Sequence, residues 1–241
     1  MQYATQAFTA NPGLAASLNA YAFHGYNVYA PRNEPESNAP SEVPLLDKIA
    51  LTAGMTEREG VPTTAPFWIT ELGWPSTGDN TEAEQAQWTV RAVLLAALGG
   101  VDGVFLYTMG DGPHPEAFPP EDAFGLVRYD ADYGDGVDPG DKPVFVALRT
   151  LFATVGAFHV EARENVAGHA DDAFVLRLGV GARRAWAVWV LDTVNATVAW
   201  TPPSRSSPYA RVTLDGTTGS LPVGQAITLS SSPLLVVEPT P

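Results

Sequence analysis

The chain has 241 residues, of which 45% are hydrophobic and six are tryptophan, a composition typical of a folded protein with one large or two small domains. Its net charge of −14 excludes a basic surface that could neutralise phosphates, so we expect no nucleic-acid partner. No apolar run approaches the length of a membrane span, so we expect no membrane partner, and without cysteine neither disulfides nor thiolate metal sites can form.

The first residues, Met-Gln-Tyr-Ala-Thr, lack the basic and apolar regions of a signal peptide. We therefore expect, by default, a soluble cytoplasmic protein. The eighteen residues that precede Asn19 have room for part of one helix and a loop.

Three short runs rich in aromatic and β-branched residues predict buried strands within residues 18–26, 67–76 and 104–112. Two segments with apolar residues at helical spacing, 43–60 and 81–98, separate these runs. Strands that alternate with helices at this spacing predict right-handed βαβ units and a parallel sheet.

The second predicted helix has clear end signals. Thr81 is a favourable N-cap, and Glu82 and Glu84 place acidic groups in the first turn, where the helix dipole favours them. Gly99 and Gly100 predict its end.

Each predicted strand ends in polar or aromatic residues, and in a parallel α/β barrel these ends form the face that carries active sites. Glu71 is the most informative of them, because a carboxylate at the end of an apolar strand is costly to bury unless it is used or paired. The alternative is a strand-terminal glutamate solvated in a loop. The six candidate site residues are His24, Tyr26, Glu71, Trp74, Tyr107 and Asp111.

At these residues the chain resembles a known group of enzymes. Three segments carry the resemblance, namely His24-Gly25-Tyr26, Trp68-Ile69-Thr70-Glu71-Leu72-Gly73-Trp74-Pro75 and Phe105-Leu106-Tyr107-Thr108-Met109-Gly110-Asp111-Gly112. Their order is similar to the last three strands of the (β/α)8 barrel in retaining glycoside hydrolases with two catalytic glutamates, in particular the β-xylosidase-like branch. The resemblance covers residues 19–151. It implies that Glu71 is the nucleophile and that His24, with Tyr26, lines a sugar subsite, although His24 could instead be a hydrogen-bonded core group. Trp74, Tyr107 and Asp111 are the other candidate substrate-binding residues, and Asp111 could instead form a turn.

The chain departs from that family at the acid/base glutamate. In the family this residue lies in an Asn-Glu-Pro motif at the end of the fourth strand, and no such strand precedes Asn19 here. The tripeptide Asn33-Glu34-Pro35 follows the His24 strand instead, and we interpret it as coincidence. The alternative is that Glu34 is a surrogate acid/base, for which it would have to lie about 5–5.5 Å from Glu71.

From Phe158 onward, short alternating segments separated by turn residues predict six or seven strands and an antiparallel β-sandwich. The predicted fold is therefore α/β plus β, with a truncated barrel of about three βα units at residues 1–154 and the sandwich at 155–241. Trp186, Trp189 and Trp200 could form a sugar-stacking platform, but their apolar strands favour core packing.

These features favour a hydrolase of O-glycosidic bonds, in which Glu71 attacks the anomeric carbon and a second acid protonates the leaving oxygen. The expected partner is a carbohydrate or another small-molecule substrate, and we expect neither cofactor nor metal. Two alternatives stay open. One is a promiscuous hydrolase of activated esters in a reshaped cleft, and the other is an inactive remnant that binds carbohydrate.

Three barrel strands cannot close a sheet, because closure requires about eight strands at a consistent tilt. An open parallel sheet would leave strand edges and an apolar inner face uncovered, although parallel strands are usually buried on both faces. We therefore expect a homodimer, in which a second copy completes the open barrel and supplies the missing acid.

Overall fold

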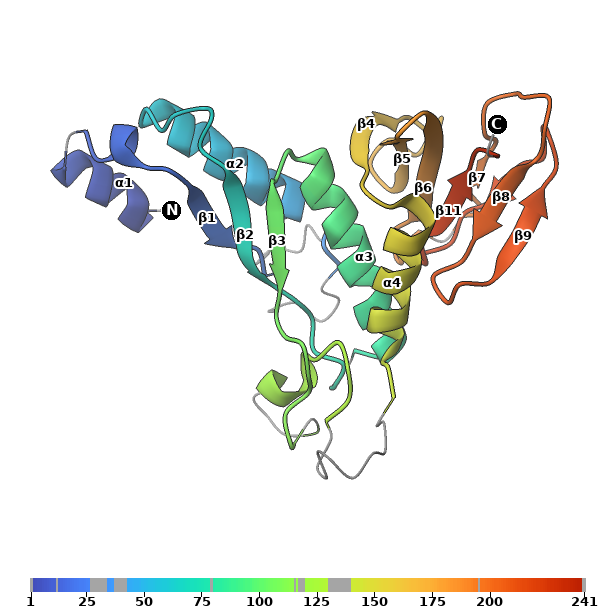
Figure 1. Cartoon of the computed structure of the whole chain (residues 1–241), viewed down its shortest axis with the longest axis horizontal. Helices are drawn as coiled ribbons and strands as arrows, with labels where there is room; N and C mark the ends of the chain where they lie inside the picture. Colours follow the sequence, from blue (N-terminus) through green and yellow to red (C-terminus); the bar gives the residue numbers. More distant parts are fainter. Residues whose placement is uncertain are drawn as a thin grey trace.

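The chain is a mixed α/β protein in which two long helices lie between a parallel sheet and an antiparallel sheet (Figure 1). The parallel sheet and its helices come first in the sequence, and the antiparallel strands follow. The computed structural model describes residues 2–11, 13–26, 34–36, 43–78, 80–114, 116, 120–129, 140–194 and 196–239.

The three predicted parallel strands are present and adjacent. β1 (Tyr21–His24), β2 (Phe67–Leu72) and β3 (Gly103–Leu106) pair in that order, and both pairs are parallel. The register places His24 opposite Glu71. The carboxyl ends of all three strands therefore meet at one edge of the sheet.

The two helices predicted at residues 43–60 and 81–98 form, as α2 and α3. α3 begins with a complete capping box, in which Thr81 Oγ1 accepts a hydrogen bond from the Glu84 amide at 3.1 Å and Glu84 Oε2 accepts one from the Thr81 amide at 2.7 Å. The α-helices are α1 (Gln2–Ala10), α2 (Leu45–Arg58), α3 (Glu82–Leu98) and α4 (Pro143–Val155), with short 3-10 helices η1 (Ala15–Ser17) and η2 (Pro120–Ala123).

In the described part of the chain, one face of the parallel sheet is covered by helices and the other is open. Phe67 and Ile69 of β2 are buried in the cluster that contains the apolar side chains of α2 and α3. On the opposite face Trp68 is 36% exposed and Phe105 is 54% exposed, with their rings edge to face at 6.3 Å. The expectation that these runs are buried on both faces therefore does not hold for the single chain, because no described helix covers the second face.

The strands after α4 pair antiparallel throughout, as predicted. β9 was not expected from the sequence, and it forms by pairing with β8. The larger sheet has the order β4 (His159–Glu164), β5 (Ala173–Val180), β6 (Arg183–Val190), β11 (Leu234–Val237), β8 (Tyr209–Val212) and β9 (Thr218–Leu221), while β7 (Ala199–Trp200) pairs with β10 (Ile227–Thr228).

The tryptophans of this part pack inside the protein. Trp189 is fully buried and stacks on Phe174 with a centroid distance of 5.1 Å, and Trp186 and Trp200 are also buried. The core interpretation of these three residues therefore holds, and a sugar-stacking platform does not, because their rings have almost no exposed surface.

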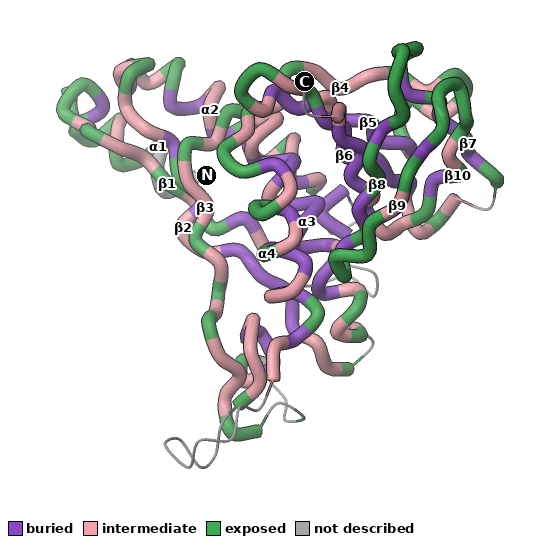
Figure 2. Tube along the Cα trace, turned by 45° about the vertical axis from the view of Figure 1, so that its right-hand side comes forward, coloured by how far each residue is buried: buried purple, intermediate pink, exposed green. Residues whose placement is uncertain are grey.

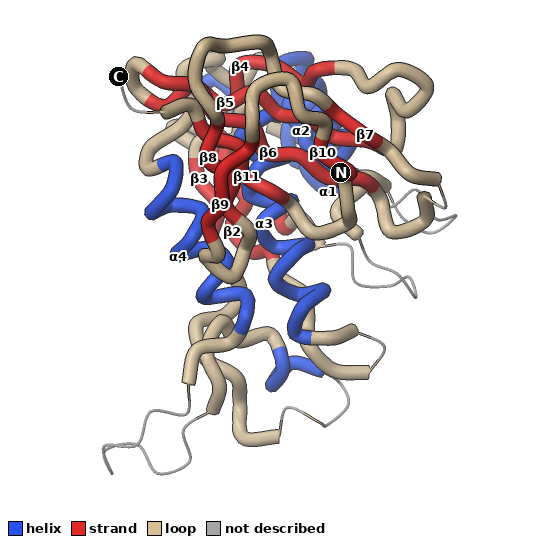
Figure 3. The backbone as a smooth tube through the Cα atoms, turned by 90° about the vertical axis from the view of Figure 1, so that its right-hand side faces the viewer, coloured by secondary structure: helices blue, strands red, loops and turns tan. Residues whose placement is uncertain are grey.

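One apolar cluster runs from the parallel sheet to the antiparallel sheet, and a second, which contains Trp186 and Trp200, lies within the antiparallel part. The first cluster contains Ile69 of β2, Leu94 of α3, Leu151 of α4 and Leu176 of β5. Figure 2 shows the buried positions concentrated along α3, α4, β5 and β6, and Figure 3 shows α3 and α4 running below the strands. The predicted boundary after residue 154 falls at the end of α4, and the division into two domains stays a prediction.

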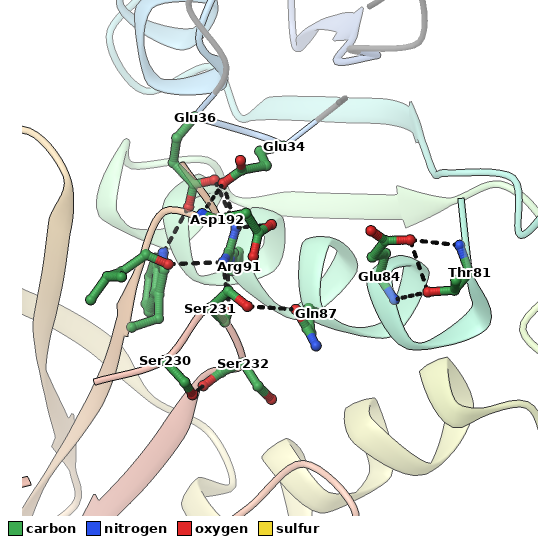
Figure 4. A network of polar contacts seen from close by, with 12 residues as sticks. Glu34, Glu36, Thr81, Glu84, Gln87, Arg91, Asp192, Ser230, Ser231 and Ser232 are labelled. Atoms are coloured by element: carbon green, nitrogen blue, oxygen red, sulfur yellow. Dashed lines mark hydrogen bonds and ion pairs between the residues drawn. The ribbon is translucent and has the colours of Figure 1, made fainter. Parts of the chain in front are cut away.

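Arg91 is fully buried in α3 and joins that helix to the antiparallel sheet (Figure 4). Its Nε and Nη2 donate to the carbonyl oxygen of Ser231 at 3.0 and 2.5 Å, and Nη2 also donates to the carbonyl oxygen of Val190 at 3.1 Å. Its Nη1 donates to Glu34 Oε2 at 2.9 Å and lies 3.6 Å from Glu36 Oε2. One guanidinium therefore links α3, β6, the loop before β11 and residues 34–36.

The network around Arg91 contains more carboxylates than cations. Asp192 lies 3.9 Å from Arg91, and Trp189 donates to Glu36 Oε1 at 2.9 Å. Burial raises the pKa of Glu34 and the pKa of Glu36, although the charge of Arg91 opposes the shift. With a raised pKa the folded state holds protons that the unfolded chain releases. Stability contributed by these groups is therefore lost as pH rises from their ordinary pKa of 4.5 through the raised value.

We predict that Arg91→Met lowers the free energy of unfolding by about 3–5 kcal/mol near pH 8, because it removes the buried guanidinium that pairs with Glu34 and Glu36. The loss should shrink near pH 5, where the carboxyl groups can take up protons. Urea unfolding at both pH values measures it. The control Arg177→Met removes a half-exposed cation that pairs with Glu161 and Glu164, and should cost about 0–1 kcal/mol. Equal losses for the two variants would contradict the prediction.

Candidate active site

The carboxyl ends of β1, β2 and β3 bring four of the six candidate residues to one edge of the sheet. His24 ends β1, Tyr26 follows it, Glu71 lies one residue before the end of β2, and Tyr107 directly follows β3. Backbone hydrogen bonds hold these ends together, from the Gly25 amide to the Glu71 carbonyl oxygen at 3.0 Å, and from the Tyr107 amide to that of Leu72 at 2.9 Å.

One of the two carboxylate oxygens of Glu71 is held by neighbouring side chains. Its Oε2 accepts a hydrogen bond from the Tyr26 hydroxyl at 3.0 Å and lies 3.4 Å from His24 Nδ1. Within the described part of the chain, its Oε1 has no hydrogen-bond partner, and the side chain is 41% exposed. The carboxylate is therefore fixed in direction, while one oxygen can reach a ligand.

Tyr26 is a hydrogen-bond donor to this carboxylate under all ordinary conditions. Burial raises the pKa of its hydroxyl, and the hydrogen bond to Glu71 and the negative charge of Glu71 raise that pKa further. The ring packs edge to face against His24 at 6.3 Å and against Phe124 at 6.2 Å, and Lys48 Nζ donates to the Tyr26 carbonyl oxygen. The phenol therefore stays protonated and positioned.

Tyr107 lies beside this group on the neighbouring strand. Its ring is 39% exposed and packs against Phe124 at 5.6 Å. Gly73 permits this arrangement, because a Cβ atom at that position would lie 2.1 Å from the Tyr107 carbonyl oxygen. The glycine that follows Glu71-Leu72 therefore allows the ends of β2 and β3 to approach closely.

The remaining two candidates do not face the open edge. Asp111 Oδ1 accepts hydrogen bonds from Lys142 Nζ at 2.9 Å and from the Gly125 amide at 2.8 Å. Lys142 is fully buried and also donates to Ser76 Oγ at 2.8 Å. Trp74 is 1% exposed and packs in the core. In this structure Asp111 thus connects its own loop and the loop at Gly125 to Lys142 at the start of α4. The Trp74 ring is buried.

Glu34 lies in the network around Arg91, as described above. Its carboxylate accepts from Arg91 Nη1 and from the Asp192 amide, and the contacts described for it do not include Glu71. Asn33, the first residue of the tripeptide, lies outside the described residues. The structure therefore brings Glu71 together with His24, Tyr26 and Tyr107, but it does not bring Glu34 to them.

Sequence reasoning missed the two buried cations that engage these carboxylates. Arg91 interrupts the apolar run Val90-Arg91-Ala92-Val93 of α3, and Lys142 directly precedes the proline that begins α4. A charged residue within an apolar helix face was the available signal, because such a residue needs a buried partner.

The described residues offer no cluster of three or more histidine, aspartate or glutamate side chains placed to hold a metal ion. The aspartate- and glycine-rich segment from Asp130 to Asp141 is similar to a calcium loop but lacks its terminal glutamate, so the sequence favours a solvated loop. Residues 130–139 of this segment lie outside the described part. Among the described helices, none is both long and apolar enough to cross a bilayer.

Comparison with known proteins gives matches among solved structures. No family model matches the chain, and no curated protein matches it. A family 39 glycoside hydrolase from Bacteroides cellulosilyticus WH2 aligns with a TM-score of 0.73 at 21% identity, covering 97% of this chain and 46% of that chain. A family 30 subfamily 8 xylanase from Clostridium acetobutylicum aligns with a TM-score of 0.54 at 11% identity, covering 97% and 51%.

A conserved exported protein from Bacteroides fragilis also aligns, with a TM-score of 0.56 at 11% identity, covering 92% of this chain and 46% of that chain. The chain thus spans about half the length of these structures. It shares their fold over that half, which confirms the predicted resemblance to glycoside hydrolases at the level of the fold. The β-xylosidase-like branch and the pair of glutamates stay predictions.

We predict that Gly73→Ala lowers the free energy of unfolding by about 1–3 kcal/mol, because the new Cβ would force the ends of β2 and β3 apart. Urea unfolding measures the loss. In the control Gly54→Ala, within α2, the nearest atom is 3.7 Å away, and alanine should raise stability by about 0.5–1 kcal/mol. A Gly73→Ala variant as stable as the wild type would show that the strand ends can separate freely.

Proposed function

We propose that the protein is a hydrolase of O-glycosidic bonds that works with retention, with Glu71 as its nucleophile. The observation that carries the proposal is the orientation and the exposure of the Glu71 carboxylate. One oxygen is fixed by Tyr26 and His24, and the other is open at the carboxyl end of a parallel sheet. A nucleophile needs both orientation and access, and Glu34 and Asp111 lack access in this structure.

The proposed reaction has two steps. Glu71 attacks the anomeric carbon and displaces the leaving group, which forms a glycosyl ester, and water then hydrolyses this ester. The Tyr26 hydroxyl orients the carboxylate and hydrogen-bonds the oxygen that becomes the ester carbonyl. His24 and Tyr107 would contact the sugar.

The fold supports this proposal, since the chain is similar over its length to half of a family 39 and of a family 30 glycoside hydrolase. The family 30 relative is a xylanase, so xylosides belong among the first substrates to be tested. The proposal includes the architecture of a partial (β/α)8 barrel, at residues 1–154, followed by a β-sandwich at residues 155–241.

The test is a panel of aryl glycosides and aryl esters, assayed with the wild type, Glu71→Gln and the control Glu57→Gln. Glu57 lies exposed on α2. We expect Glu71→Gln to lower glycoside cleavage by at least about 10³-fold with the fold intact, and Glu57→Gln to have no effect. Mass spectrometry should also find a glycosyl group on Glu71 after reaction with an activated 2-fluoro glycoside.

Each other outcome selects an alternative. Glycoside cleavage that survives in Glu71→Gln would exclude this residue as the nucleophile. Ester cleavage that survives the substitution, without glycoside cleavage in the wild type, would favour an ester hydrolase. Inactivity on every substrate, with measurable sugar binding, would favour a carbohydrate-binding remnant.

We also propose that a second copy of the chain covers the open face of the parallel sheet. In the described part, β1 and β3 each have a neighbour on one side only, and Trp68 of β2 and Phe105 of β3 lie exposed on one face of the sheet. Parallel sheets are usually covered on both faces. A stable obligate dimer would bury about 2,000 Å² or more.

We predict that the 25.6 kDa chain sediments as a dimer at micromolar concentration, and that Phe105→Ser shifts it toward the monomer. The reason is that this variant places a polar group at the centre of the proposed contact, on a side chain that is already 54% exposed in the single chain. Analytical ultracentrifugation measures both masses. A wild-type protein that is folded and monomeric would refute the dimer.

A further inference from the structure

The ring of Phe124 lies against the residues that follow all three parallel strands. Its centroid is 6.2 Å from that of Tyr26, after β1, and 5.6 Å from that of Tyr107, after β3, and both pairs are edge to face. Its Cδ1 atom lies 3.2 Å from the point that a Cβ atom on Gly73, after β2, would occupy. One ring from a distant segment of the chain therefore joins the three strand ends at the site.

The apolar core does not explain the burial of Phe124. The residue is 8% exposed, yet in the described part of the chain it belongs to neither of the two apolar clusters. The buried Trp74 and Phe174, in contrast, belong to the first cluster. Aromatic pairs prefer offset or edge-to-face arrangements, so the Phe124 ring restricts the positions that the rings of Tyr26 and Tyr107 can take.

Two buried charges hold the backbone on both sides of Phe124, and the proposed reaction does not use them. Lys142 Nζ donates to the carbonyl oxygen of Ala123 at 3.3 Å, and Asp111 Oδ1 accepts a hydrogen bond from the Gly125 amide at 2.8 Å. Nζ and Oδ1 also pair with each other at 2.9 Å, and Lys142 is fully buried. Because buried charges need such polar partners, they hold the backbone of residues 123–125 in place.

The same segment is joined to the loop that follows Glu71. Gln85 of α3 is 1% exposed, and its Nε2 donates to the carbonyl oxygen of Trp74 at 2.7 Å and to that of Gly125 at 3.3 Å. Buried hydrogen-bond networks of this kind make the parts that they join rigid. The Phe124 ring and the end of β2 are therefore held in one frame.

We propose that Phe124 is a positioning residue of the site, a role that rests on the function proposed above. Its ring holds the Tyr26 phenol where the hydroxyl donates to Glu71 Oε2 at 3.0 Å, and Glu71 Oε1 is thereby aimed at the sugar. Asp111, a candidate substrate-binding residue from the sequence, acts one step farther away, because it holds the segment that carries the ring. A nucleophile that is turned out of line loses rate, since the reacting atoms must be aligned.

The test is a double-mutant cycle of Phe124→Leu and Tyr26→Phe, measured as the rate at which an activated 2-fluoro glycoside labels Glu71. We expect Phe124→Leu to slow labelling by about 10–10²-fold in the wild-type background, because the Tyr26 hydroxyl no longer orients the carboxylate. In the Tyr26→Phe background no hydroxyl remains to be positioned. There the same substitution should change the rate by no more than about twofold.

The matched control is Phe174→Leu, which removes a buried ring that stacks on Trp189 in the antiparallel sheet. It should lower stability in urea but change the labelling rate by less than about twofold, because it lies outside the site. Phe124→Met is the second variant, since methionine fills the space of the ring without its fixed geometry. It should slow labelling as Phe124→Leu does, and it carries the same cycle if Phe124→Leu does not fold.

A second readout does not depend on turnover. With 3-fluorotyrosine incorporated, the fluorine resonance of Tyr26 is assigned by its loss in Tyr26→Phe, and its shift with pH follows the phenol proton. Burial and the hydrogen bond to Glu71 raise the pKa of Tyr26, and the loss of the Phe124 ring weakens both. The phenol should therefore lose its proton at a lower pH in Phe124→Leu than in the wild type, and at an unchanged pH in Phe174→Leu.

The outcomes separate this role from the proposed function. An equal fall in labelling rate in both backgrounds, or a Tyr26 titration that Phe124→Leu leaves unchanged, would overturn the role of Phe124 alone. No labelling of Glu71 in the wild type would overturn the proposed function and the role of Phe124 together.

Discussion

The burial of Arg91 is the constraint on which the arrangement of the two sheets depends. A guanidinium without access to water must find acceptors for its N–H groups, and here they come from Val190, Ser231 and Glu34, which lie far apart in the sequence. These donors lie in one plane, so the acceptors must hold fixed positions. α3 therefore sets the position of the antiparallel sheet and of residues 34–36 at the same time.

The carboxylates of the molecule fall into two groups by their partners. Glu34 and Asp111 are buried against the cations Arg91 and Lys142, which use their charge to join segments of the chain. Glu71 has a phenol and an imidazole as neighbours and keeps an open oxygen. In Glu34 and Asp111 the carboxylate oxygens are used in structural contacts with a cation. In Glu71 one oxygen remains available for chemistry. This contrast supports Glu71, rather than Glu34 or Asp111, as the proposed nucleophile.

Local features of the fold were predictable from sequence, because they depend on neighbouring residues. The periodicity of β1, β2 and β3 and the capping box of α3 are of this kind. The Glu34–Arg91 and Asp111–Lys142 pairs depend on contacts between distant segments, so these pairs could not be predicted from local sequence patterns. β9 has a weak apolar pattern and forms through its partner strand.

The site was predicted as a group of residues at the strand ends. Two of these residues do not face the open edge, because Trp74 packs in the core and Asp111 pairs with the buried Lys142.

The shared core has a consequence for how the gene can be divided. A cut after α4 would separate Leu94 and Leu151 from Leu176 and Trp189, which pack in the same cluster. Each piece would expose apolar surface that its counterpart now covers. The antiparallel strands β5 and β6 therefore contribute to the same buried cluster as α3 and α4.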